Sequence, residues 1–232
     1  MLNHLQKTVF ALVVLVSTSL PASAESIDVR VIGTITPPGC HPALSGGGTV
    51  DYGSINSKSL AADAYTVLPE KQLDFTITCD APAKIALKAI EGRPNTAPGL
   101  NANGNLDVTT ARIFGLTAGS EGVNGLGLDG TAKIGGYGIR LAAGTITADG
   151  VSVDSLSSSD MVTWSKTAVG SLHVANSPRY STWAATGTTT PVAFTTLAGK
   201  LGVQAYINKA SALDLTKPVL LDGLTTLELV YL

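Results

Sequence analysis

The chain has 232 residues, with 15 Lys and Arg against 17 Asp and Glu, and a formal net charge of −2 at pH 7. This balance gives no basic surface for nucleic acid or anionic lipid, so it disfavours partners of both kinds. Charged residues make up only 14% of the chain, against about 25% in typical globular proteins. Together with abundant Gly, Ser, Thr and Ala, this composition is typical of exported proteins built from short strands and many turns.

The first 24 residues have the pattern of a secretory signal peptide. Lys7 precedes a short apolar core at residues 10–16, and a small-residue Ala-Ser-Ala sequence ends at Ala24. The apolar core is shorter than the roughly 20 residues of a membrane-spanning helix, and no later stretch reaches that length. We therefore expect cleavage after residue 24, a mature domain over residues 25–232, and no membrane insertion after cleavage. An uncleaved anchor is the less favoured alternative.

The mature N-terminus alternates as a strand with one buried face does. Five residues share one parity: Ile27, Val29, Val31, Gly33 and Ile35. The Pro-Pro-Gly sequence that follows should end the strand, because proline cannot donate to a β ladder. Pairing within the chain and pairing with another chain would produce the same pattern, so the sequence leaves the partner of this strand open.

The chain has two cysteines, Cys40 and Cys79, and both lie in the part that is predicted to reach an oxidising compartment. We predict that they form a disulfide bond with each other. In the chain-entropy model, closing a loop of about 40 residues contributes roughly 4 kcal/mol. A metal or reactive-thiol site is disfavoured, because there is no CxxC pair and the exported part has only His41 and His173. We expect no metal and no cofactor.

Further strands are predicted from alternating apolar residues along the rest of the chain. Leu73, Phe75, Ile77 and Cys79 share one parity, and Ile85, Leu87 and Ala89 repeat the pattern as a neighbouring strand would. Short strands are predicted near residues 108–114, 134–141, 145–153, 162–164 and 171–174. Residues 203–207 alternate again, and residues 224–232 form a terminal strand. Close spacing of such short strands is typical of a sandwich or barrel.

One string in the sequence is specific enough to indicate a family. The pattern C-x-P-x-x-x-G-G-G-x-V-D-Y-G at residues 40–53, with Leu221-Asp222-Gly223 and the closing Val230-Tyr231-Leu232, resembles the GltF-like family of exported, fimbria-associated proteins. The wider layout is similar to chaperone-usher pilin subunits: an alternating N-terminal segment, two cysteines, and a terminal strand with a penultimate tyrosine. The resemblance covers the first third and the last eighth of the mature chain.

This resemblance implies an all-β, immunoglobulin-like, pilin-type sandwich with an elaborated middle region around residues 91–200. Pilins lack their final strand, and their open groove is filled first by a periplasmic chaperone and then by the N-terminal extension of the next subunit. The resemblance assigns the donor strand to Ile27, Val29, Val31, Gly33 and Ile35, and a chaperone-facing strand to Leu227, Leu229 and Tyr231. It implies a periplasmic chaperone, an usher and other fimbrial subunits as partners, and a location in the periplasm and then in a fimbrium or at the cell surface.

An enzyme is disfavoured, because the chain has no G-x-S-x-G elbow, no H-E-x-x-H motif and no Walker loop. The alternative function is a self-contained periplasmic or surface module that binds glycans. Trp164, Tyr180 and Trp183 suggest it, since aromatic rings on a loop-rich β-scaffold can stack against sugars. Packing of the two tryptophans in the core is the simpler interpretation. We therefore expect a non-catalytic, fimbria-type structural subunit.

Overall fold

The computed structural model describes residues 28–35, 39–99, 108–116, 121–174 and 177–232. The chain divides into two units, Met1–Thr36 and Pro37–Leu232. The predicted signal peptide and Ile27 lie outside the described residues.

Residues 28–35 are the described part of the first unit. They belong to no helix or strand, and their apolar side chains are largely exposed, from 86% for Val29 to 100% for Ile35. A contiguous row of exposed apolar side chains of this kind is typical of an interaction segment.

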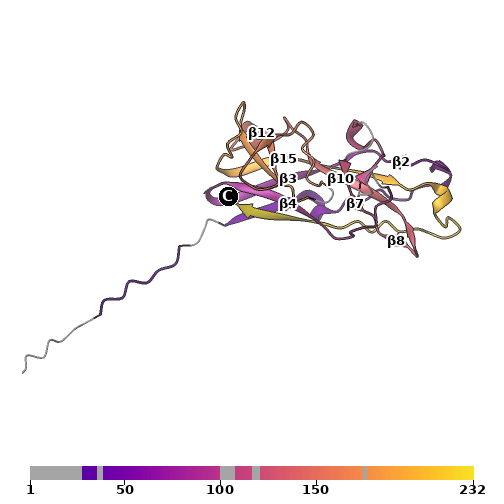
Figure 1. The fold of residues 1–232 in the computed structure, drawn as a ribbon, viewed down its shortest axis with the longest axis horizontal. Coiled ribbons are helices and arrows are strands. Elements are labelled where there is room, and N and C mark those ends of the chain that lie inside the picture. The colour runs from indigo at the N-terminus through magenta and orange to yellow at the C-terminus, as the bar shows by residue number, and fades with distance from the viewer. Residues whose placement is uncertain (1–27, 36–38, 100–107, 117–120, 175–176) are drawn as a thin grey trace, which may run out of the picture. The chain divides into compact units, whose positions relative to one another are not determined.

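The second unit is an antiparallel β-sandwich (Figure 1), so the prediction of an all-β fold is confirmed. Its main sheet has 12 strands, eight of which follow the path β1-β3-β15-β11-β12-β14-β4-β16, with β2, β7, β10 and β13 pairing beside it. The bounds of these strands are β1 Cys40–Leu44, β2 Thr66–Val67, β3 Lys71–Ala83, β4 Ile85–Glu91, β7 Asn124–Gly125, β10 Gly135–Leu141, β11 Thr147–Ala148, β12 Val151–Ser158, β13 Ser165–Lys166, β14 Tyr180–Ala185, β15 Phe194–Ile207 and β16 Thr225–Tyr231.

Smaller elements complete the described part of the second unit. Two two-stranded sheets pair β5 (Val108–Thr109) with β6 (Glu121–Gly122) and β8 (Leu128–Asp129) with β9 (Ala132–Lys133). The 3-10 helices are η1 Ser45–Gly48, η2 Ser57–Ser59, η3 Ile113–Gly115 and η4 Ala210–Ala212. No helix in the described ranges has the length and apolar character needed to cross a membrane.

The core lies between the group of strands around β3 and β15 and the group around β4, β12 and β14. The predicted inward parity of β3 is confirmed, since Phe75 and Ile77 are 1% and 0% exposed. From the other group, Trp183 meets the ring of Phe194 edge-on, with centroids 6.0 Å apart. Fully burying one such large apolar side chain stabilises the fold by roughly 1.5–3 kcal/mol.

The predicted disulfide between Cys40 and Cys79 is confirmed. The two residues stand directly opposite each other where β1 pairs with β3. The bond therefore fastens β1, an end strand of the sheet path, to the long central strand beside it.

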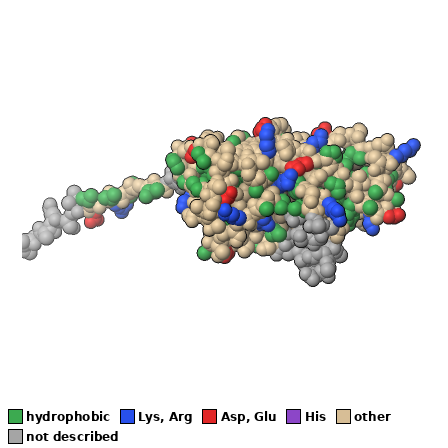
Figure 2. Space-filling view, turned by 90° about the horizontal axis from the view of Figure 1, so that it is seen from above, with side chains coloured by type: hydrophobic (Ala, Val, Ile, Leu, Met, Phe, Trp, Pro, Cys, Tyr) green, Lys and Arg blue, Asp and Glu red, His purple; other side chains and the backbone are tan. Residues whose placement is uncertain are grey.

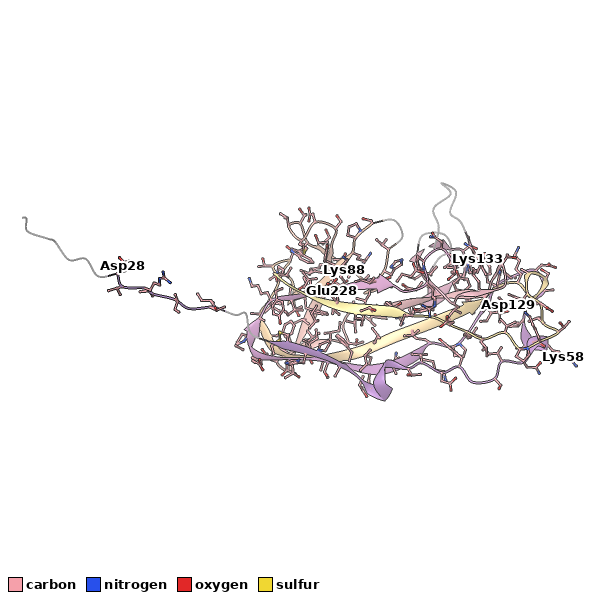
Figure 3. All side chains as sticks on the ribbon, turned by 90° about the horizontal axis from the view of Figure 1, so that it is seen from below. Asp28, Lys58, Lys88, Asp129, Lys133 and Glu228 are labelled. Atoms are coloured by element: carbon pink, nitrogen blue, oxygen red, sulfur yellow. A yellow bond between two sulfur atoms is a disulfide. The ribbon has the colours of Figure 1, made fainter. Side chains whose placement is uncertain are left out.

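The C-terminal strand also agrees with its prediction, because β16 covers Thr225–Tyr231. It pairs with β4 along its whole length, and Figure 3 shows Glu228 near its register partner Lys88. The strand β4 follows β3 in sequence but pairs with β14 and β16 instead. A connection of one residue, Lys84, thus carries the chain from one side of the sandwich to the other.

Several short strands differ from their predicted form. Residues 145–153 form a hairpin, not one strand, because Asp149 and Gly150 have φ of 48° and 80°, and two positive φ values make a two-residue hairpin turn. Residues 162–164 lie in a loop around Asp160, whose carboxylate accepts hydrogen bonds from the backbone N–H of Val162 and Thr163. In the region 171–174, Ser171 makes only an isolated bridge. Residues 108–114 divide between β5 and η3.

Residues 92–134, here called the arm, lead from β4 to β10. The described part of the arm has its own small apolar cluster, which includes Ala97, Ile113 and Val123 and packs on Tyr206 of β15. The Tyr206 hydroxyl donates a hydrogen bond to the carbonyl oxygen of Pro98 at 2.8 Å. The arm is therefore attached to the main sheet by buried contacts of its own.

Candidate functional site

An apolar groove of about 1040 Å³ lies in the second unit, between the two ends of the sheet path. Its walls combine residues from β1, β3, β10, β15 and β16 with two segments outside the strands and with Leu126 and Ile134 of the arm. Representative lining residues are Leu44, Leu73, Val203, Ile207, Leu213 and Leu227.

The floor of the groove is a row of alternate residues on β15. Leu201, Val203, Ala205 and Ile207 all line it, as the period of two in a strand requires. Six residue steps at about 3.3 Å give this row a length of roughly 20 Å. The floor is thus as long as a strand of six or seven residues.

The first side of the groove, residues 49–55, is here called the first lip. The chain reaches it through η1, where Gly46, Gly47 and Gly48 have φ of 61°, 64° and 77°. Such left-handed backbone is costly for any residue with a Cβ, so the three glycines make this change of direction possible. Within the lip, the Tyr52 hydroxyl donates to the carbonyl oxygen of Val203 and accepts from the N–H of Ala205, both at 3.1 Å.

The other side, residues 213–224, is here called the second lip. Its half-buried side chains alternate with exposed ones: Leu213, Leu215, Val219 and Leu221. This is the pattern of a strand, but none of these residues belongs to one. Among the described residues, 214–221 make no backbone-to-backbone hydrogen bond. Unpaired backbone beside an apolar groove is able to bond an incoming strand.

The two end strands of the sheet path converge beyond one end of the groove. The backbone N–H of Cys40 donates to the Tyr231 hydroxyl at 2.9 Å, which joins β1 to β16. Four residues further along each strand from this contact, Leu44 and Leu227 line the groove. The strands therefore separate from their contact onward, and the groove occupies the gap between them.

The groove offers little charge to a ligand. Burial raises the pKa of Tyr137 to about 12, and its hydroxyl lies 2.6 Å from Oγ1 of Thr225. Burial likewise raises the pKa of Tyr52, so both tyrosines stay neutral at ordinary pH. The charged lining residues are Asp51, which accepts a hydrogen bond from the N–H of Gly53, and Lys217, which pairs with Asp129. The groove is suited to an apolar, uncharged ligand surface.

The predicted site residues on the C-terminal strand lie beside this groove. Leu227 and Leu229 are half-buried against the core, and Leu227 lines the groove, while Tyr231 is 43% exposed. On the predicted donor segment, Val29, Val31, Gly33 and Ile35 are exposed. The structure does not place that segment relative to the groove.

The second lip is an element that the sequence analysis did not predict, whereas most of the first lip lies in the string at residues 40–53. The signal of the second lip was present as alternation at Leu213, Leu215, Val219 and Leu221, interrupted by Lys217 and Pro218. A proline within an alternating run lowers its value as a strand signal.

Among the aromatic residues considered for glycan binding, Trp183 is 1% exposed and belongs to the core. Trp164 and Tyr180 are half-buried, and the Lys88 ammonium lies 6.0 Å from the centre of the Tyr180 ring. Within the ranges described, no group of three or more His, Cys, Asp or Glu side chains is arranged to hold a metal ion. Figure 2 shows acidic and basic side chains intermixed on the face in view.

Comparisons with known proteins give a family and two relatives. Residues 29–138 match the family described as "Protein of unknown function (DUF1120)". The chain is 28% identical to Protein GltF of Escherichia coli (strain K12) over an alignment of 243 residues, gaps included, and this alignment covers 96% of this chain and 94% of GltF. It is 30% identical to Uncharacterized protein YhcF of the same organism over 233 residues, which cover 91% and 92% of the two chains. No solved structure matches.

Proposed function

We propose that this chain, which belongs to the family of GltF and YhcF, is a fimbria-type structural subunit that joins its neighbours by strand complementation. Residues 27–35 of one copy fill the apolar groove of the next copy. Before that, a strand from a periplasmic chaperone occupies the groove, and at an usher this strand is replaced by the N-terminal segment of another copy. The subunit is non-catalytic and acts in the periplasm and then in the fibre.

The groove with its two open lips is the observation that carries this proposal. Both end strands of the sheet path border it, and both lips offer backbone groups that no neighbouring strand uses. An added strand would bond these groups and fill the apolar groove at the same time. An uncovered edge of this kind is otherwise a site of aggregation, so a groove partner is expected throughout export.

The N-terminal segment has the length and pattern that the groove requires. Its eight described residues would extend over seven residue steps, or roughly 23 Å as a strand, against roughly 20 Å for the groove floor. Val29, Val31 and Ile35 share one parity, and burying three such side chains would contribute roughly 5–9 kcal/mol before the cost of ordering the segment. Gly33 adds no side chain between them.

The route of the protein supports the same proposal. The predicted signal peptide directs the chain to an oxidising compartment, and a structural disulfide such as Cys40–Cys79 is typical of that compartment. The groove side of β16 carries no other strand in the described structure. The chaperone strand that is proposed to bind first would lie along the groove side of Leu227, Leu229 and Tyr231, whose hydroxyl accepts a hydrogen bond from the Cys40 N–H.

The test is an assembly gel of the unaltered full chain and two variants, extracted from the native host and run in SDS without heating. Val31→Asp places a charge on the proposed inserted face and should abolish the ladder of linked subunits. Ile32→Asp is the matched control, because Ile32 is equally exposed, at 88% against 93% for Val31, and has the opposite parity. The unaltered chain and Ile32→Asp should both give ladders that collapse on boiling.

Two outcomes of this gel would contradict the proposal. Ladders of equal length from Val31→Asp and Ile32→Asp would show that the parity of the segment has no role in assembly. A single band from the unaltered chain with and without heating would favour a self-contained protein whose N-terminal segment folds into its own sheet.

A further inference from the structure

The second lip is held in place by contacts with the arm. Its Asp222 forms two hydrogen bonds with Arg93: the Arg93 Nε donates to Oδ2 at 2.8 Å and Nη2 donates to Oδ1 at 3.0 Å. Lys217 Nζ lies 2.8 Å from Oδ1 of Asp129, near the tip of the β8–β9 hairpin. The two ion pairs are separated by four residues along the lip and both lead to the arm.

Backbone and apolar contacts add to these ion pairs at the end of the lip nearest β16. The N–H of Asp222 donates to the carbonyl oxygen of Leu126, and the N–H of Gly92 donates to that of Leu224. Gly223 lies so close to Leu126 and Tyr137 that a Cβ there would come within 2.7 Å of the Tyr137 ring. This end of the lip is therefore fixed by several contacts.

The other end has much weaker attachment. Among the described residues, 214–221 lack backbone-to-backbone hydrogen bonds, and Leu220 is 79% exposed. The Lys217–Asp129 ion pair attaches the side chains of this stretch to the arm, while Asp214 accepts hydrogen bonds locally from Thr216. Asp129 raises the pKa of Lys217, as a carboxylate in direct contact does. The position of this stretch thus depends on side-chain contacts, which are the Lys217–Asp129 pair and the packing of Val219 and Leu221 on the core, and not on a β ladder.

We propose that Asp129 and Arg93 are positioning residues of the arm, which hold the second lip, through Lys217 and Asp222, at the spacing that accepts a strand. This inference rests on the proposed function and specifies what controls its acceptor site. Neither Asp129, Arg93 nor Asp222 lines the groove, so their effect on an inserted strand is indirect. When the pairs are lost, part of the binding energy is used to order the lip, and affinity falls.

Ionic strength gives this arrangement a measurable signature. Lys217 and Asp222 are 53% and 63% exposed in their side chains, and exposed ion pairs are screened by salt. Strand affinity should therefore fall as salt rises, and the fall should shrink when the pairs are removed. A purely structural role of these residues would change the melting temperature without changing the salt dependence of binding.

The experiment measures binding of a synthetic peptide with the sequence of residues 25–36. The acceptor is the full mature chain carrying Val29→Asp and Val31→Asp, so that its own segment does not compete. Calorimetric titrations at low and high ionic strength are made with this parent acceptor and with acceptors that also carry Asp129→Asn, Asp222→Asn or both. Each single substitution should raise the dissociation constant about two- to fivefold at low salt. The two substitutions together should remove most of the salt dependence of binding.

The control is Asp74→Asn, which makes the same charge change in an ion pair between β3 and β15. Neither Asp74 nor its partner Lys200 lines the groove, so the dissociation constant should match that of the parent acceptor. An arm variant could lower the melting temperature more than this control does. In that case the double variant Arg93→Asp with Asp222→Arg, which exchanges the two charges, tests whether the ion pair itself positions the lip. Recovered affinity supports positioning by the ion pair, and unrecovered affinity overturns it.

The outcomes separate the two proposals. No peptide binding to the parent acceptor would overturn strand complementation itself. Binding with equal dissociation constants in the parent, Asp129→Asn and Asp222→Asn would overturn only the positioning role of the arm and would leave strand complementation intact.

Discussion

The second lip and β16 are consecutive stretches on one side of the groove, and they carry the same sequence pattern. Half-buried residues alternate with exposed ones from Leu213 to Leu221, with an interruption at Lys217, and again from Thr225 to Leu229. Yet β16 pairs with β4 at seven consecutive positions, whereas the described part of the chain supplies no strand partner for the lip. Alternation therefore reports which side chains face an apolar surface, and it does not report whether the backbone has a partner.

The same distinction applies to residues 28–35. Their alternation is as clear as that of β3, but β3 is buried between partners and the N-terminal segment is exposed. A strand pattern that has no partner among the described residues is what an interaction between chains would use.

Amide hydrogen exchange should give the largest difference between the lip and β16. The N–H groups of β16 that bond to β4 should exchange through global unfolding, while those of residues 214–221 should exchange almost without protection. For a typical domain stability of about 5 kcal/mol or more, this difference exceeds a factor of about 10³. Mass spectrometry of exchanged peptides measures it. Slow exchange of the N–H groups of residues 214–221 in the protein without an inserted strand would contradict the inference that their backbone has no hydrogen-bond partner.

Loss of Trp183 should give the next largest effect, and it tests the paired side of the comparison. Trp183→Ala removes a fully buried ring that contacts Phe194 and should lower the free energy of unfolding by about 3–5 kcal/mol. Urea unfolding followed by circular dichroism measures the change. Trp164→Ala is the control and should cost clearly less, because Trp164 is only half-buried. Equal losses of unfolding free energy in the two variants would mean that the difference in burial does not determine how much each ring stabilises the fold.

Substitution in the glycine turn should have a smaller effect and tests how the first lip is set. Gly47→Ala forces a Cβ into backbone with φ of 64° and should lower the free energy of unfolding by about 1–2 kcal/mol. The space around Gly47 is open, so the cost is conformational and not a clash. Gly33→Ala is the control: Gly33 also has open surroundings but no positive φ, and unfolding should be unchanged within error. An equal loss at both positions would exclude the conformational explanation.

Much of the fold could be predicted from the sequence where side-chain pattern and burial agree. The inward parity of Phe75 and Ile77, the Cys40–Cys79 bond and the extent of β16 all follow from local alternation and cysteine count. The hairpin at Asp149-Gly150 was also readable, since Asp-Gly between alternating residues is a strong turn signal. The prediction of a single strand over residues 145–153 did not use this signal.

Other features could not be predicted, because they depend on contacts between distant residues. The loop around Asp160 contains apolar residues but is held by hydrogen bonds to one carboxylate. Strand β14 contains two consecutive alanines and gave no clear alternation, yet it is central to its side of the sandwich. The groove-lining role of residues 49–55 and 213–224 appears only when both are seen beside β15.

The sequence by itself determined which residues turn inward, which two cysteines bond, and that the N-terminal segment has one apolar face. These properties depend on the period of two along a strand and on chemistry local to a residue. The tertiary structure decided that β4 pairs with β16 and not with β3, and that the gap between β1 and β16 stays open as a groove. Such choices are made by packing between segments far apart in the chain, where many pairings satisfy the same local pattern and only one buries the shared core.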